Sequence, residues 1–258
     1  MKPIEILSRE FSTQAFSDGE PYDEMLDRYK SIACSYAHME NAVAVLSDLR
    51  TNASYICYGN FARTLGISQD ESVTGSGPEM VSVSSIWEED IFRLIHPDDL
   101  AGKHLHELCF FHFIKRQPRK NRADWYLISK LRMKGSMNSY IPVLHRMFYI
   151  QSRPDGALWL ALCLYSPLAF DIPSQCMVIN SVDGSIIGLE SGNSPNILTP
   201  REKQILTLID KGLMSKEISG RLSISINTVS RHRQEILGKL QVKNSIEACR
   251  IAKDLKLI

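Results

Sequence analysis

The sequence predicts two domains of different fold class, an α+β domain followed by an all-α domain. Its 258 residues are enough to build two compact cores. Strand-like runs separated by turn residues occupy the middle of the chain, whereas apolar residues at helical spacing dominate its end. The charge changes at the same point, because the chain from Ile197 onward has 12 basic and 6 acidic residues, against 18 and 23 before it. A small basic domain of this kind suggests a polyanionic partner.

The first part of the α+β region has helical spacing and then strand-like runs. Apolar residues at helical spacing predict a helix over about residues 20–44, and strands are expected at 42–48 and 54–59. A short helical segment, 61–67, comes next. Residues 72–85 have the Gly, Ser and Pro content of a loop.

A long helix is expected to begin at Pro97, since proline suits a first helical position and Asp98 and Asp99 favour the positive end of the helix dipole. It is expected to run to about Arg116. Three strand-like runs then predict a meander with turns at 135–138 and 153–156, followed by a short pair of strands. These five runs span residues 125–133, 140–151, 157–167, 177–181 and 185–190.

The six cysteines are scattered, with no CxxC pair and no metal-type Cys/His spacing. We therefore expect reduced core thiols in a cytoplasmic protein. The N-terminus has no signal-peptide pattern, and no apolar run approaches the length of a membrane span, so no membrane partner is expected.

The C-terminal region predicts four helices. Thr199, Pro200 and Glu202 form a capping box with proline at the first helical position, and Gly212 ends that helix. A second helix is expected over about residues 215–222, and the turn 223–225 leads to a third helix, capped by either Ser225 or Asn227. Its inner positions are Val229, Ile236 and Leu240, and a fourth helix begins near Asn244 and Glu247.

The third helix has outward polar side chains that suit the major groove of DNA. Ser230, Arg231 and Gln234 project outward within about one turn. Arginine can grip guanine and glutamine can grip adenine, each giving roughly 1–3 kcal/mol of discrimination. Contacts to phosphates are expected from Lys216, Thr228, Arg233 and Lys239.

The run LTPREKQIL…KEI…L.IS.NTV..H…I..KL.V.N..EA resembles the LuxR/GerE family of bacterial helix-turn-helix domains over about the last quarter of the chain. The resemblance implies that the third helix reads DNA and that the fourth forms dimer contacts. The DNA-binding residues so expected are Lys216, Asn227, Thr228, Ser230, Arg231, His232, Arg233, Gln234 and Lys239. The dimer residues so expected are Ala248, Ile251, Ala252 and Leu255.

Some positions depart from the family pattern. Met214 stands where a Ser or Thr cap is usual, so Ser215 is expected to cap the second helix one position later. Ser219 replaces the usual Ala, Ser230 the usual Lys, and Ser245 the usual Arg. The loss of a basic residue at position 230 makes Arg231 the principal expected base contact.

The order of elements in residues 42–167 resembles a PAS sensor domain, and Ile95-His96-Pro97-Asp98-Asp99 looks like a stretch that many PAS domains have before a helix. The resemblance implies a domain that binds a small molecule or pairs with another copy. The sequence lacks the Asn-Cys-Arg-Phe-Leu type motif of photochemical flavin domains. It also does not resemble a phosphorylatable receiver domain, because it has no regular βα alternation.

A group of histidines and a basic loop each suggest a more specific function, and in both cases we favour the simpler interpretation. His104, His106 and His112 on the long helix could provide a haem or metal ligand, but a partly exposed helix edge is the more common situation. The basic loop from Lys115 to Arg122 could be a second nucleic-acid patch, but charged loops are usually only solvated. The sequence thus predicts no metal site, no cofactor and no catalytic residues, and hence no enzyme.

We expect a bacterial transcription regulator that binds double-stranded DNA as a homodimer and is modulated by its sensor domain. The expected parts are a helical extension (1–41), a PAS-like domain (42–190), a linker (191–197) and a LuxR-type domain (198–258). Two alternatives stay open. The larger domain could be a ligand-independent interaction module, or, less favoured, an enzyme tethered to a DNA-binding tail.

Overall fold

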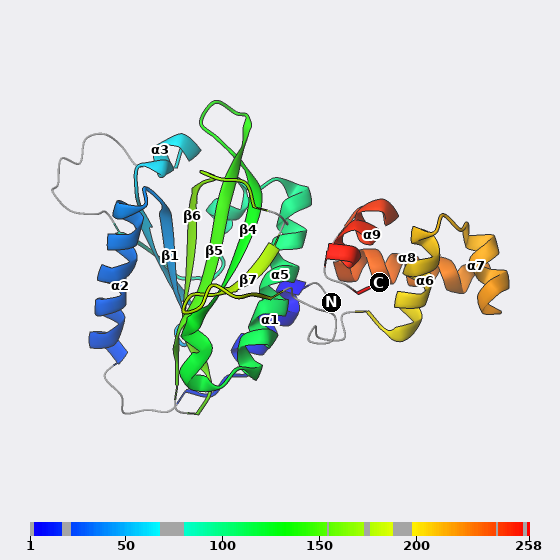
Figure 1. The fold of residues 1–258 in the computed structure, drawn as a ribbon, viewed down its shortest axis with the longest axis horizontal. Coiled ribbons are helices and arrows are strands. Elements are labelled where there is room, and N and C mark those ends of the chain that lie inside the picture. The colour runs from blue at the N-terminus through cyan, green and yellow to red at the C-terminus, as the bar shows by residue number, and fades with distance from the viewer. Residues whose placement is uncertain are drawn as a thin grey trace. The chain divides into compact units, whose positions relative to one another are not determined.

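The computed structural model describes residues 3–16, 22–67, 80–153, 155–172, 176–187, 198–240, 242–254 and 257–258 (Figure 1). Backbone contacts divide the chain into two compact units. One comprises Met1–Ser12, Leu100–Arg116 and Ile187–Ile258, and the other comprises Thr13–Asp99 and Gln117–Ile186.

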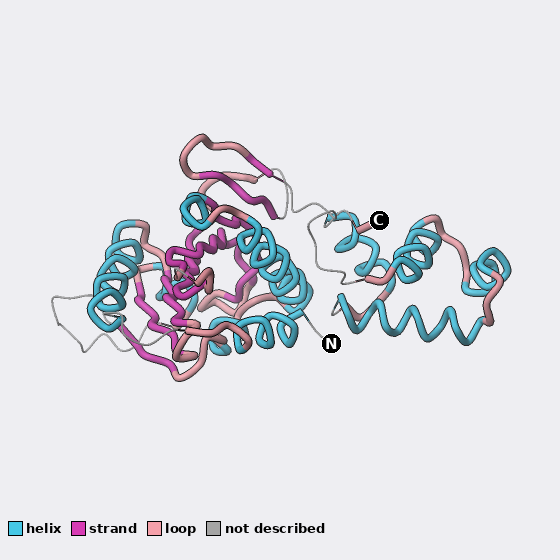
Figure 2. The backbone as a smooth tube through the Cα atoms, turned by 90° about the horizontal axis from the view of Figure 1, so that it is seen from below, coloured by secondary structure: helices cyan, strands magenta, loops and turns pink. Residues whose placement is uncertain are grey.

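The second unit is built on a mainly antiparallel sheet with strand order β3-β2-β1-β6-β5-β4-β7-β8. Figure 2 shows the strands together in magenta, with helix α2 (Tyr22–Met39) beside them. The strands are β1 (Val43–Asp48), β2 (Ala53–Tyr58), β3 (Met80–Val83), β4 (Trp125–Lys134), β5 (Tyr140–Ser152), β6 (Leu158–Pro167), β7 (Cys176–Asn180) and β8 (Ile186–Ile187). The α+β character of this region is therefore confirmed.

The two turns of the meander form where the sequence predicts them, and the β1–β2 hairpin has a turn of similar residue types. In the β1–β2 hairpin, Asp48 Oδ1 accepts hydrogen bonds from the amides of Arg50 (2.9 Å) and Thr51 (3.3 Å), and Asn52 takes a positive φ of 55°. The meander β4–β5–β6 has Asn138 and Gly156 at its turns, with φ of 62° and 94°. These residue types tolerate the left-handed conformation that tight turns need.

The pairing of β1 with β6 joins the hairpin to the meander, with Val43 opposite Tyr165 and Asp48 opposite Leu160. The strand at Met80–Val83 was not expected, because residues 72–85 have a loop composition. It pairs with β2 at the edge of the sheet, where only alternate side chains are partly covered. The rest of that predicted loop, 72–79, lies outside the described residues.

Helix α2 packs on β1 and β2, and its buried face includes Leu26, Ala33 and Ala37. It ends at Met39, before the predicted boundary at Ala44, because the amide of Ala42 donates to Ala37 O and the chain then enters β1. The shorter helices of this unit are α3 (Phe61–Leu65), α4 (Glu89–Phe92) and the 3-10 helix η1 (Arg119–Asp124). Neither α4 nor η1 was expected from the sequence, since neither is long enough to show helical periodicity.

The expectation that all cysteines are reduced thiols is wrong for two of them. Cys34 of α2 and Cys57 of β2 form a disulfide. The two bonded residues are 23 positions apart, and sequence spacing alone did not show that the helix packs over this strand.

The long helix α5 (Pro97–Arg116) begins at the predicted proline. In the second unit, Asp99 fixes this start because its carboxylate accepts from the backbone amide (2.8 Å), Nε (2.9 Å) and Nη2 (2.7 Å) of Arg132 in β4. These contacts give the acidic pair after the proline a structural role.

The first unit includes α5 from Leu100 onward and the N-terminal helix α1 (Pro3–Ser12), and Phe11 meets Phe111 edge to face at 5.3 Å. The expected partly exposed histidine edge on α5 is wrong for His104 and His106, which are both buried, whereas His112 is partly exposed. Burial lowers the pKa of His106 to about 4. The helix is apolar on more than one face, so its sequence periodicity did not show which histidines are covered.

We predict that Asp48→Ala destabilises the sheet, since the buried Asp48 carboxylate also accepts from Trp159 Nε1 at 3.0 Å. Removing it leaves buried donors without their acceptor, at a cost of about 1–3 kcal/mol. The free energy of unfolding, measured by urea denaturation, should fall by this amount. Asp90→Ala, which breaks only an exposed pair with Arg93, should have a much smaller effect, and equal losses in both variants would contradict this role for Asp48.

Candidate nucleic-acid interface

The C-terminal domain begins with the predicted capping box. The Thr199 hydroxyl accepts from the amide of Glu202 (3.2 Å), and the Glu202 carboxylate accepts from the amide of Thr199 (2.6 Å). These bonds start α6 (Pro200–Asp210), and Gly212 follows its end with φ of 83°. Both predicted boundaries of this helix are confirmed.

The next two helices, α7 (Ser215–Leu222) and α8 (Ile226–Leu240), are joined by a three-residue turn in which Ser223 is left-handed. Of the two predicted caps for α8, Ser225 is the one used, because its hydroxyl accepts from the amide of Thr228 at 3.0 Å. The buried residues Ile218, Val229 and Ile236 hold the two helices in one core. Two short helices packed at a tight turn are the arrangement of a helix-turn-helix.

Helix α7 is capped in a different way from the one predicted for a sequence with Met214 in place of a Ser or Thr cap. Met214 is the N-cap of α7 and its amide donates to the Glu217 carboxylate at 2.7 Å. Ser215 is the first helical residue, and its hydroxyl instead accepts from Arg233 Nη1 at 3.2 Å. The expected transfer of the cap to Ser215 is therefore wrong, since Glu217 already satisfies the amide at the helix start.

One face of α8 is exposed and polar. Asn227, Ser230, Arg231 and Gln234 are all exposed, and their spacing of three, four and seven positions places them on one side of the helix. Val229, Ile236 and Leu240 occupy the opposite, buried side. Lys216 is exposed on α7.

An acidic residue that sequence reasoning missed lies beside this face. Glu235 approaches Arg231 Nε at 3.5 Å and His232 Nδ1 at 3.0 Å. The pair with Arg231 is solvent-exposed and so contributes little to stability. The sequence did contain a signal for these contacts, because Glu235 follows Arg231 by four positions and His232 by three on the same helix.

Two of the expected phosphate contacts already have partners within the domain. Arg233 donates from its two terminal nitrogens to the hydroxyls of Ser215 (3.2 Å) and Ser245 (3.0 Å), bridging α7, α8 and the start of the last helix. Lys239 donates to both oxygens of Glu202 at 2.7 Å. In this arrangement both side chains hold helices together.

Glu202 is the centre of this packing and is almost fully buried. Burial opposes ionisation of its carboxyl, but hydrogen bonds from Lys239 and from Thr199 outweigh this and lower its pKa. The carboxylate thus connects the start of α6 to the last turn of α8.

The last helix, α9 (Ser245–Asp254), starts as predicted, with Asn244 Oδ1 accepting from the amide of Glu247 at 2.9 Å. Ala248, Ile251 and Ala252, which were expected at a dimer contact, are buried in the core of their own unit. They are not available to a second chain in this structure, because the apolar stripe of an amphipathic helix is the side that its own domain covers. The fourth expected residue, Leu255, lies outside the described residues.

Among the described side chains of α9, the exposed ones are Ile246, Arg250 and Lys253. Ile246 is 85% exposed, which is unusual for a large apolar side chain. These residues line one wall of a hollow of about 450 Å³, and Ile209 and Asp210 of α6 line the other.

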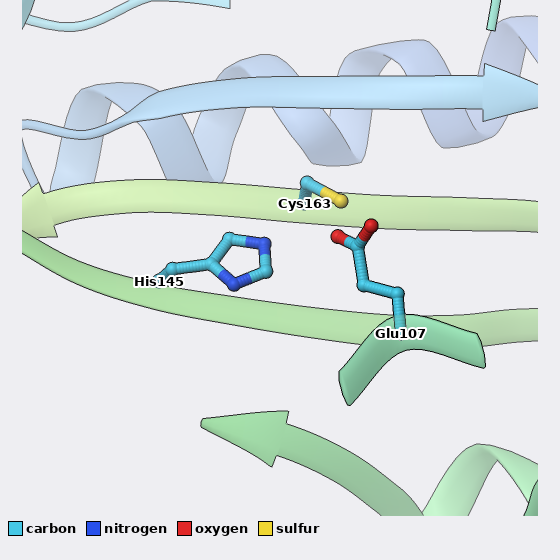
Figure 3. Close-up of side chains that lie close together, drawn as sticks. All are labelled: Glu107, His145 and Cys163. Carbon is cyan, nitrogen blue, oxygen red and sulfur yellow. The ribbon is translucent and has the colours of Figure 1, made fainter. Parts of the chain in front are cut away.

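Among the residues that the structure describes, two side-chain groups contain residues that could ligate a metal. Glu202, His232 and Glu235 place ligand atoms within 4.8 Å of one another, but a cation there would have to displace Lys239 from Glu202. In the sheet, His145 of β5 and Cys163 of β6 project from neighbouring strands (Figure 3). His145 Nδ1 lies 3.0 Å from Ser129 Oγ. Glu107, the third side chain drawn there, belongs to α5, where it accepts from Lys103 at 2.6 Å.

Comparison with known proteins identifies the class of this domain. Residues 196–252 match the family described as "Bacterial regulatory proteins, luxR family". The C-terminal region therefore matches LuxR-type helix-turn-helix domains, and a relative that matches over it is a transcriptional regulatory protein.

Curated relatives match over this domain. The chain is 48% identical to the transcriptional regulatory protein DesR of Bacillus subtilis over 59 residues, which are 23% of this chain and 30% of that protein. It is 47% identical to the nitrate/nitrite response regulator protein NarL of Escherichia coli over 53 residues, 20% of this chain and 24% of that one. The matched segments span less than a third of the length of these two relatives.

Solved structures align over more of the chain but only loosely. A phage VqmA–DPO complex covers 93% of this chain and 94% of its own, with 11% identity and a TM-score of 0.30. Escherichia coli SdiA covers 99% and 97%, with 14% identity and a TM-score of 0.25. Within the described part of this chain, no helix is long and apolar enough to cross a membrane.

We predict that Lys239→Ala destabilises the C-terminal domain, because it leaves the buried Glu202 carboxylate without its cation. The expected loss is about 1–3 kcal/mol in the free energy of unfolding, measured by denaturant titration. Lys243→Ala removes an exposed lysine nearby and should change stability by less than about 0.5 kcal/mol. If both variants unfold alike, the Glu202 contact is not stabilising.

The pKa of Glu202 also predicts a pH dependence. Because this pKa is lowered in the folded state, its contribution to stability is complete above the ordinary glutamate pKa and is lost as the pH falls through the folded value. Glu202→Gln should be less stable than the wild type near neutral pH, and the difference should shrink on acidification. Unfolding curves recorded at several pH values below 6 would test this, and a constant difference would contradict it.

Proposed function

We propose that this protein is a sequence-specific transcription regulator that binds double-stranded DNA through α8. The observation that supports this most directly is the single exposed face formed by Asn227, Ser230, Arg231 and Gln234 within a LuxR-type domain. An α-helix fits the major groove, where each base pair presents a distinct pattern of donors and acceptors.

Within that face, Arg231 and Gln234 are the residues we assign to base reading. Arg231 is 69% exposed at its side chain and has only the weak contact with Glu235 to give up. Exposed Lys216 and the N-terminal end of α8, including Thr228, are assigned to phosphates. Arg233 and Lys239 have hydrogen-bond partners on other helices of the domain, so we assign them a structural role. His232 would contact a phosphate only after breaking its contact with Glu235.

We further propose that the protein pairs through α9, with Ile246 at the centre of the contact. Its exposure provides an apolar centre for a two-fold contact, and Arg250 and the ion pair of Lys253 with Asp210 (2.7 Å) would lie around it. Two copies of α8 would then meet half-sites about one helical turn apart.

The N-terminal region is proposed to be a PAS-like sensor that sets the spacing of the two DNA-binding domains. The support is the order of elements: a two-stranded hairpin, the short helix α3, the helix beginning at Pro97 and a three-stranded meander. The alternative is a ligand-independent interaction module. It predicts a protein that purifies without a small molecule and dimerises regardless of additives.

We predict that Arg231→Ala relaxes base choice at one position of the binding site, with a loss of roughly 1–3 kcal/mol of discrimination there. Selection from a randomised duplex pool, compared with the wild type, measures this. Arg93→Ala, which removes an exposed arginine from the other unit, should leave the selected sequence unchanged. Failure of the wild type to enrich any sequence would count against DNA reading by the free protein.

We also predict that Ile246→Glu weakens pairing, since it places a charge in an apolar contact. Sedimentation should show a shift toward monomer, and binding to a two-half-site duplex should weaken at least tenfold. Met137→Glu alters an equally exposed apolar residue in the β4–β5 turn and is the matched control. An unchanged oligomeric state in Ile246→Glu would rule out this face as the contact.

A further inference from the structure

A pocket of about 410 Å³ lies in the second unit, at the end of β5 where the chain enters the turn to β6. Its walls come from η1, through Arg119 and Lys120, and from β5 and the following residue, through Tyr149, Ser152 and Arg153. The volume falls in the range of small-molecule sites.

The end of β5 is irregular where it lines this pocket. The pairing register with β6 shifts between Tyr149 and Gln151 and again between Gln151 and Ser152. Gln151 is fixed there by donating from Nε2 to Tyr29 Oη at 2.6 Å. Such bulges redirect side chains and are common next to binding sites.

Positive charge is concentrated around the pocket. Arg119, Lys120 and Arg153 line it, and none of the described lining residues is acidic. Buried Arg122 belongs to η1 but is not among the lining residues, and its pKa is lowered by burial and also by the positive charge of Arg119. An anion would relieve this repulsion between guanidinium groups.

The arginines behind the surface are held in place. Arg122 donates from Nε to Gln117 O (3.2 Å) and from Nη1 to Gly156 O (2.8 Å), tying η1 to the β5–β6 turn. Arg153 is 3% exposed and stacks on the Tyr22 ring, with its guanidinium carbon 4.6 Å from the ring centre. The pocket thus has one fixed, buried cation in its lining, Arg153, beside the exposed Arg119 and Lys120, and Arg122 holds η1 in place.

We propose that this pocket binds the phosphate or pyrophosphate group of a small molecule. Guanidinium groups match the geometry and charge of phosphate oxygens, and the Ser152 hydroxyl provides a further donor. A concave site of this size accommodates a compact anion with room for an attached organic group, whereas a DNA backbone needs an extended surface. The inference goes beyond the proposed DNA-binding function and does not depend on it.

The test is calorimetric titration of the full chain, without DNA, with pyrophosphate, ADP and malonate in a phosphate-free buffer. We expect saturable binding of pyrophosphate or ADP and at least tenfold weaker binding of malonate. Tighter binding of ADP would indicate a phosphorylated organic ligand, and tighter binding of pyrophosphate would indicate the free anion. Malonate binding as tightly as both would overturn the assignment to phosphate.

The matched variants are Arg119→Gln/Lys120→Gln in the pocket and Arg93→Gln/Lys134→Gln outside it, which remove the same charge from exposed positions. The pocket variant should bind at least tenfold more weakly and the control should bind like the wild type. Equal affinities in the two variants, or no saturable binding by the wild type, would overturn the proposal. Displacement of bound pyrophosphate by a short duplex of unrelated sequence would instead show a nucleic-acid surface.

Discussion

The contact between Glu202 and Lys239 is the interaction on which the C-terminal helical domain depends. A carboxylate in an almost fully covered position is costly unless its oxygens are satisfied. Here the amide of Thr199 and the ammonium of Lys239 satisfy them, so the first turn of α6 and the last turn of α8 are fixed by one group. The direction of α8, and with it the exposed face at Arg231, follows from this contact and the apolar core around it.

Much of the fold could be predicted because its signals are local. The capping box at Thr199, the proline at 97 and the turns at Asn138 and Gly156 act within a few residues, and all appear where the sequence places them. The strand order depends on contacts between distant segments, so the pairing of β1 with β6 and the disulfide between Cys34 and Cys57 could not be read from spacing.

In the candidate interface, too, local features could be predicted from the sequence, whereas contacts between different helices could not. Helical periodicity correctly separated the exposed residues of α8 from its buried ones. It could not show that Arg233 and Lys239 have partners on other helices, because a basic residue at a helix edge has the same sequence pattern in either role. On α9 the apolar stripe was assigned to a second chain, but it is the side that the domain itself covers.

The pairing of β1 with β6 also bears on how the chain emerges from the ribosome. Val43 in β1 pairs with Tyr165 in β6, which is synthesised more than a hundred residues later. Until then, this edge of β1 has no strand beside it. Contacts of such long range are slow to form, and an open strand edge invites pairing with other chains in the meantime. The helices after Thr199 contact one another across much shorter sequence separations than β1 and β6, so the nascent larger domain is the part that benefits more from protection by chaperones.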